Sequence, residues 1–255
     1  MGAVAIPRFP LTIDNETVQI GTANELALAL DVLQGQYDRA ALEQLEPHLA
    51  GIIGNASGFM LVMRSLAKED QLFLIQAIGP ELATVMQDAR HLRDQLAVMA
   101  MEDVEEALIQ TLGGDGLRWL ILTGEELAEV LEWVYGQCDA LVLELLGLDT
   151  LRKLCRHASD LSAVLYNLDH ALQEKLLEQA GWPFIIDLVR DGRDLAGLVR
   201  ALPPQSSERL LRHFTRQQLV ELIGNERDWA YLCQRLEPAE ADFLFGLLNI
   251  QTKGA

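Results

Sequence analysis

The side chains of this chain that could bind metal or transfer protons are its carboxylates, three cysteines and five histidines. Cys138, Cys155 and a neighbouring histidine such as His157 could form a metal site, because thiolate and imidazole are common zinc ligands. The histidines, however, form no ligand pair at helical spacing, and the chain has neither an HExxH nor a CxxC motif. We therefore interpret both cysteines as small core residues and His157 as a surface residue.

Two further patterns could suggest a site. Glu125, Glu129 and Glu132 would lie on one face of a helix, where a weak cation site is the alternative to a solvated surface. Gly113-Gly114-Asp115-Gly116 resembles a phosphate-binding loop but lacks the preceding strand and the following lysine, so we expect a turn between helices. We predict no catalytic residues, no metal and no cofactor.

The strongest pattern in the chain is an internal repeat of about 34 residues. A fixed period of this length is typical of arrays in which each unit buries its apolar face against its neighbours. Seven units can be aligned from these starts: Asn24, Ser57, Arg90, Glu125, Ser159, Arg193 and Arg227.

Within each unit, the apolar spacing predicts two amphipathic helices and a short third helix. Prolines fall at the expected starts of second helices (Pro203, Pro204, Pro238) and third helices (Pro47, Pro80, Pro183). Glycines fall between second and third helices (Gly79, Gly147, Gly181), and Gly124 and Gly192 are expected to close whole units. The fold class predicted is all-α, a right-handed α-solenoid of about seven three-helix repeats.

We predict one solenoid domain over residues 24–255, preceded by a non-repeat segment, residues 1–23. Within that segment, residues 11–20 alternate between apolar and polar types, as in a strand or hairpin. The segment is expected to be a cap or a flexible tail.

The stretch from Arg200 to Leu211 contains Leu202-Pro203-Pro204 followed by Leu210-Leu211. It resembles the leucine and proline pattern in the cytosolic superhelical domain of MgtE-type magnesium transporters and in flagellar motor switch proteins. This resemblance implies a superhelix of short helices and the alternative of divalent-cation sensing. In repeat length alone, the chain is similar to transcription-activator-like effectors.

The composition narrows the choice of partner and location. A formal charge of −18 disfavours nucleic acid and anionic membranes, because both require a basic surface. There is no secretory signal or apolar stretch of membrane-spanning length, so we expect a cytoplasmic protein. Translocation into a host cell by a signal-independent route, as in bacterial effectors, is the alternative.

The function predicted is a non-enzymatic scaffold that binds a protein or peptide, with a basic partner favoured by the acidic charge. The alternatives are an enzyme or enzyme subunit with a cleft in the solenoid, and a divalent-cation-responsive regulatory domain. Aromatic residues and arginine are enriched at interface hot spots. The candidate partner-binding residues, named the first-helix ridge, are Trp133, Tyr166, Arg200 and Tyr231. A homodimer through Trp229, Phe243 and Phe245 of the C-terminal repeat is also expected if no further repeat covers them.

Overall fold

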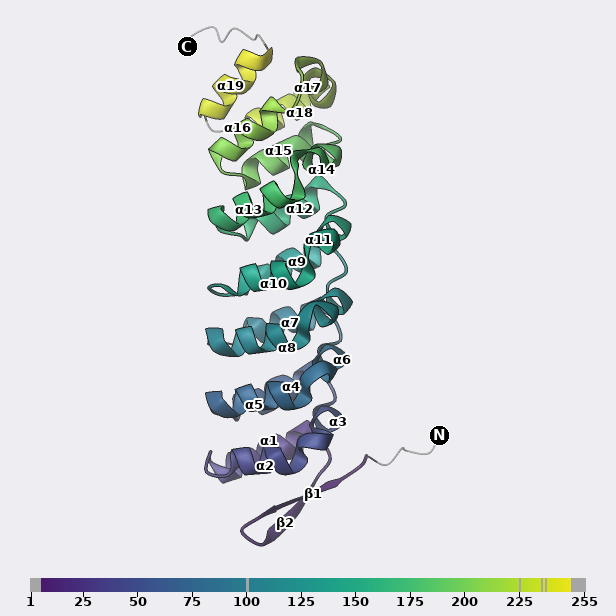
Figure 1. The fold of residues 1–255 in the computed structure, drawn as a ribbon, viewed down its shortest axis with the longest axis vertical. Coiled ribbons are helices and arrows are strands. Elements are labelled where there is room, and N and C mark those ends of the chain that lie inside the picture. The colour runs from purple at the N-terminus through teal and green to yellow at the C-terminus, as the bar shows by residue number, and fades with distance from the viewer. Residues whose placement is uncertain (1–5, 100, 225, 235, 237, 249–255) are drawn as a thin grey trace, which may run out of the picture. The chain divides into compact units, whose positions relative to one another are not determined.

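A computed structural model describes residues 6–99, 101–224, 226–234, 236 and 238–248. The described chain is mostly helical, with one β-hairpin near its N-terminus (Figure 1). It divides into two compact units: Met1–Ile121 with Trp133–Leu146, and Leu122–Glu132 with Gly147–Ala255. Of the helices in the described residues, none combines the length and apolar character that crossing a membrane requires.

The first unit begins with the hairpin and continues with helices in sequence. Its elements are β1 (Phe9–Ile13), β2 (Glu16–Ile20), α1 (Ala23–Leu33), α2 (Asp38–Leu45), η1 (Glu46–His48), α3 (Leu49–Ile53), α4 (Ala56–Arg64), α5 (Lys68–Ile78), η2 (Gly79–Glu81), α6 (Leu82–Met86), α7 (Ala89–Leu96), α8 (Glu102–Leu120) and α10 (Cys138–Leu146).

In its described residues, the second unit is helical throughout. Its helices are α9 (Gly124–Leu131), α11 (Leu148–Leu154), α12 (Ala158–Tyr166), α13 (His170–Ala180), α14 (Trp182–Leu188), α15 (Gly192–Ala201), α16 (Pro204–Arg212), α17 (Arg216–Ile223), α18 (Glu226–Cys233) and α19 (Pro238–Leu248).

The helices follow the predicted order of first, second and short third helix along the chain. Pro47 and Pro80 lie in the 3-10 turns η1 and η2, and Pro183 lies in the first turn of α14, as expected for third helices. Gly113, with φ 60° and ψ −177°, interrupts α8, so the predicted turn between helices is confirmed there.

Gly124 and Gly192 do not close units, contrary to the prediction. Each is the first residue of a first helix, α9 or α15. A Cβ atom on Gly124 would lie 2.5 Å from Asp160 Cβ, and one on Gly192 would lie 3.0 Å from Asp228 Cβ. These glycines are therefore required by close packing between first helices.

The acidic residues that open first helices are N-terminal capping groups. Thr123 Oγ1 accepts from the Glu126 N–H at 3.1 Å, and Glu126 Oε2 accepts from the Thr123 N–H at 3.1 Å. Asp191 caps α15 by accepting from the Asp194 N–H at 3.0 Å, and Asp194 accepts from the Arg190 N–H at 3.0 Å. The Thr123 and Glu126 bonds are reciprocal, whereas Asp194 bonds the residue before its cap; in both helices the carboxylates accept backbone N–H groups and so have a structural role beyond the helix dipole.

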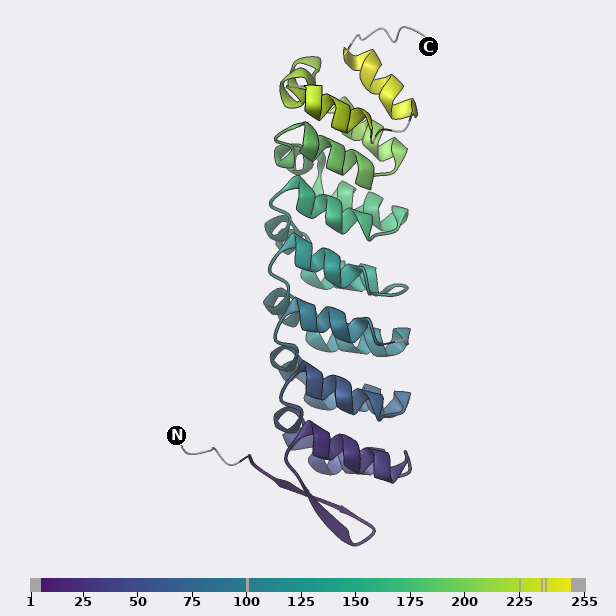
Figure 2. The same cartoon turned by 180° about the vertical axis from the view of Figure 1, so that it is seen from behind.

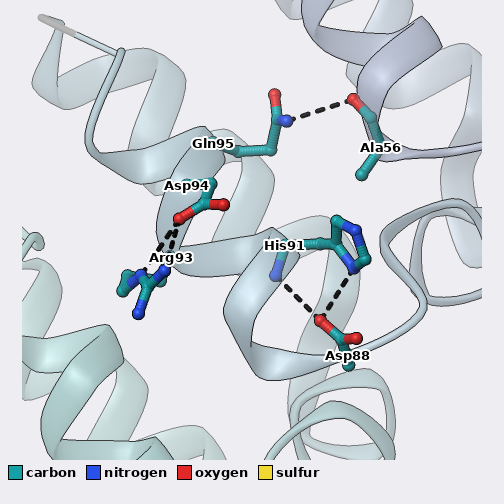
Figure 3. A network of polar contacts seen from close by, with 6 residues as sticks. All are labelled: Ala56, Asp88, His91, Arg93, Asp94 and Gln95. Carbon is teal, nitrogen blue, oxygen red and sulfur yellow. Dashed lines mark hydrogen bonds and ion pairs between the residues drawn. The ribbon is translucent and has the colours of Figure 1, made fainter.

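First helices pack on one another within each unit. In the first compact unit, α4 contacts both α1 and α7. In the second, α12 contacts both α9 and α15, and α15 also contacts α18. Side-chain amides join neighbouring helices: the buried Gln95 Nε2 on α7 donates to the Ala56 carbonyl on α4 at 3.1 Å (Figure 3), and the half-buried Asn167 Nδ2 donates to the Ala128 carbonyl on α9 at 3.0 Å. These hydrogen bonds help to fix how neighbouring first helices lie against one another, in addition to their apolar contacts.

The hairpin confirms the alternating pattern of residues 11–20. Its strands pair antiparallel with Leu11 opposite Val18, and Asp14 and Asn15 form the turn with φ of 50° and 68°. Two consecutive positive φ values are typical of a type I′ turn, for which Asn is a favoured residue. Figures 1 and 2 show the hairpin on the side of α1 and α2 that faces away from α4 and α5.

Candidate binding groove

A groove lies between the hairpin and α1 in the first unit, with a volume of about 680 Å³. Its apolar walls come from the inward face of the hairpin and from one face of α1. Three large apolar side chains that line it are exposed to solvent, as a binding site requires: Val18, Leu28 and Val32 are 49%, 66% and 74% exposed. We call this cavity the α1 groove.

Polar bonds fix the hairpin beside the helices. Gln44 on α2 accepts from the Thr12 N–H at 3.0 Å and donates to the Thr12 carbonyl at 3.0 Å. At the other end, Glu25 accepts from the Gly21 N–H at 2.8 Å and pairs with Arg8 at 2.8 Å. The hairpin wall is therefore anchored at both ends.

The exposed face of α1 corresponds to a face that is partly in contact in some of the other repeats. Leu28 lies at the repeat position of Gly197, whose Cβ, if present, would be 3.4 Å from Ser162 Oγ on the preceding first helix. Ala29 lies at the position of Gln95, which bonds to α4, and Val32 lies at that of Asn167, which bonds to α9. In those repeats part of the equivalent surface contacts the preceding first helix, whereas Leu61, Val98 and Trp133 at the same positions are 37%, 48% and 37% exposed.

The charge of the α1 groove is negative. Asp14, Glu16 and Glu25 are among its lining residues, and none of the described lining residues is Lys, Arg or His. The hydrogen bond from the Gly21 N–H, together with the Arg8 guanidinium, holds the pKa of Glu25 below its usual value, although burial acts in the opposite direction. Asp31, one turn from Leu28 on α1, is also exposed.

The predicted first-helix ridge is divided between the two compact units. Tyr166 at the end of α12 is 69% exposed, and Arg200 is exposed in the last turn of α15, a helix that packs on α12. Tyr231 lies on α18 and takes part in an interaction. Trp133 belongs to the first unit.

The residues considered for metal binding have other surroundings. Burial raises the pKa of both the Cys138 and Cys155 thiols to about 12, as expected for thiols packed in a core. The Asp160 carboxylate accepts from the His157 N–H at 2.9 Å, at the start of α12. In the part of the chain that the structure describes, three or more His, Cys, Asp or Glu residues do not gather in a group that could hold a metal ion.

Sequence reasoning missed the α1 groove because Leu28 and Val32 fit the apolar pattern of a buried helix. The signal in the sequence is weak: Leu28 is apolar where the third and fourth repeats have Asp94 and Glu129, but the second repeat also has a leucine, Leu61, at this position. Comparisons with known proteins found no family model, curated protein or solved structure that matches this chain.

Proposed function

We propose that this chain is a non-enzymatic, protein- or peptide-binding repeat scaffold, and that the α1 groove is its principal binding site. The proposal depends on one observation. Leu28 and Val32, 66% and 74% exposed, form a contiguous apolar face inside a groove of about 680 Å³ and are more exposed than Leu61, Val98 and Trp133 at the same repeat positions, which are 37%, 48% and 37% exposed. Exposed apolar patches with polar rims are typical of interaction sites.

The proposed architecture is a right-handed α-solenoid of three-helix repeats. It is supported by the repeated helix order and by the contacts between successive first helices within each compact unit. Solenoids present extended surfaces and commonly bind proteins or peptides. The carboxylates Asp14 and Glu16 lie exposed on the hairpin rather than in a closed pocket, which favours recognition over catalysis.

The test is a selection of peptides from an unbiased displayed library on the purified chain. Sequences enriched on the wild type are measured against a Leu28→Asp/Val32→Asp variant. Both side chains are exposed, so this variant is expected to fold, with circular dichroism as the check. The matched control is Val220→Asp, which places a charge at another exposed apolar site, on α17.

We expect peptides that bind the wild type and the control but lose at least ten-fold in affinity for the groove variant. Peptides that bind all three proteins equally would contradict the assignment of the groove. A library that yields no binder would contradict the scaffold function itself.

A further inference from the structure

Resting on the proposed function, we propose that the occupant of the α1 groove is an amphipathic α-helix whose apolar stripe is flanked by lysine or arginine. Three features favour such a helix: the kind of surface that α1 exposes, the occupied β1 edge of the hairpin and the charge around the groove.

The surface of α1 is shaped for a helix. Leu28 and Val32 are four residues apart and form one stripe, with Ala29 beside them. Among their repeat equivalents, Gly197, Gln95 and Asn167 lie against a preceding first helix, whereas Leu61, Val98 and Trp133 are partly exposed. A helix docked on α1 would therefore reproduce the packing that α1 itself makes with α4 in the same unit.

The β1 edge of the hairpin disfavours an extended peptide. An added strand needs free backbone donors and acceptors at a strand edge. On β1, both the N–H and the carbonyl of Thr12 are bonded to Gln44, so that edge is closed. On β2, the Gln19 carbonyl accepts from Arg8 at 3.5 Å. The β1 edge is therefore not free for a third strand at Thr12, and the proline-containing library in the experiment below tests an extended peptide at the β2 edge.

The charge around the groove selects a cationic helix. Asp14 and Glu16 lie at the hairpin turn, and Asp31 lies on α1 beside the stripe, all three exposed. Basic side chains flanking the helix's apolar stripe would meet these carboxylates, steer association and exclude acidic competitors. A second copy of this chain is disfavoured because each copy carries a formal charge of −18.

The experiment uses three displayed libraries that share one randomised apolar stripe. The first has lysine or arginine flanks, the second has aspartate or glutamate flanks, and the third has basic flanks with two central prolines that prevent a helix. Enrichment is measured on the wild type, on Leu28→Asp/Val32→Asp and on Asp14→Asn/Glu16→Gln/Asp31→Asn. Val220→Asp is again the control, and sedimentation establishes the oligomeric state.

We expect at least ten-fold preference for the basic helical library on the wild type and the control. The apolar variant is expected to abolish the preference, and the neutralised variant to reduce it several-fold and weaken its dependence on salt. Equal enrichment of the acidic or the proline library would overturn the inference, as would a wild-type dimer that Leu28→Asp/Val32→Asp converts to a monomer.

The two proposals fail in different ways. If the unbiased library yields groove-dependent peptides while the basic helical library shows no preference, the occupant is wrong and the scaffold function stands. If neither library yields a groove-dependent binder, both proposals are wrong.

Discussion

The backbone N–H of Tyr135 donates a hydrogen bond to Glu105 Oε2 at 3.1 Å, and this carboxylate is completely buried. Within the described residues, its other oxygen, Oε1, has no hydrogen-bond partner. Glu105 is the fourth residue of α8, as Gln71 is of α5 and Gln173 of α13. Both glutamines donate to carbonyls at the end of the preceding first helix, as an ionised carboxylate cannot.

The Glu105→Gln variant is predicted to lose a pH dependence of stability that the wild type has. Burial, followed by the charges of Glu102 and Asp139, raises the pKa of Glu105 to about 7, against the opposing Tyr135 hydrogen bond. Because the folded-state pKa lies above the unfolded value near 4.5, the contribution to stability is full below about pH 4.5. It is lost as the pH rises to about 7, by on the order of 3 kcal/mol.

The free energy of unfolding is measured by urea denaturation at pH 5 and pH 8, with a probe that reports on the first compact unit. The Glu105→Gln variant should reduce the difference in the free energy of unfolding between pH 5 and pH 8, and it should raise that free energy at pH 8. Glu106→Gln is the matched control, because Glu106 is the exposed neighbour of Glu105. A wild-type pH dependence that persists in Glu105→Gln would show that the buried carboxyl is not its source.

The Asp191→Ala variant tests the capping of first helices. Asp191 Oδ1 accepts from the N–H groups of Arg193 at 2.8 Å and Asp194 at 3.0 Å, which leaves these donors unsatisfied when it is removed. A loss of about 1 to 2 kcal/mol is expected from thermal or chemical denaturation. Ser159→Ala, which removes an exposed side-chain hydroxyl in α12, should change stability by less than about 0.5 kcal/mol. Equal effects of the two variants would contradict the capping role.

Much of the helical order could be predicted because the period-34 pattern, the prolines and most of the glycines agree locally. Pro47, Pro183 and Gly147 lie at helix ends, where the local backbone favours proline or glycine. The local sequence is therefore enough to predict their positions. The role of Gly124 could not be predicted, because it depends on how closely α9 approaches Asp160 of α12. That distance is a property of packing between helices.

The binding site was less predictable than the helices. The exposure of Leu28 and Val32 follows from which elements pack on α1, and periodicity alone describes them as ordinary apolar helix positions. Likewise, the buried state of Glu105 depends on its contact with Tyr135, thirty residues away in sequence. Polar residues in a helical repeat give little local sign of burial, because their environment is set by the neighbouring repeat.

The Gly124→Ala variant tests close packing of first helices. The added methyl group would lie 2.5 Å from Asp160 Cβ, so α9 or α12 must shift. Overpacking of this kind costs about 1 to 3 kcal/mol. Gly51→Ala is the comparison, because a methyl group there would contact nothing within 4 Å inside α3 and should stabilise the helix by about 0.5 to 1 kcal/mol. A Gly124→Ala variant as stable as wild type would show that these helices separate readily.

The first-helix ridge and the α1 groove can be distinguished by one double variant, Tyr166→Ala/Arg200→Glu. Both residues are exposed, so the second unit should keep its stability within about 0.5 kcal/mol. The α1 groove is lined only by residues between Leu11 and Tyr37, so the affinity of a groove-dependent peptide should change by less than two-fold. Fluorescence anisotropy with that peptide provides the measurement. A loss of ten-fold or more would instead assign the partner to Tyr166 and Arg200, since neither side chain lines the groove.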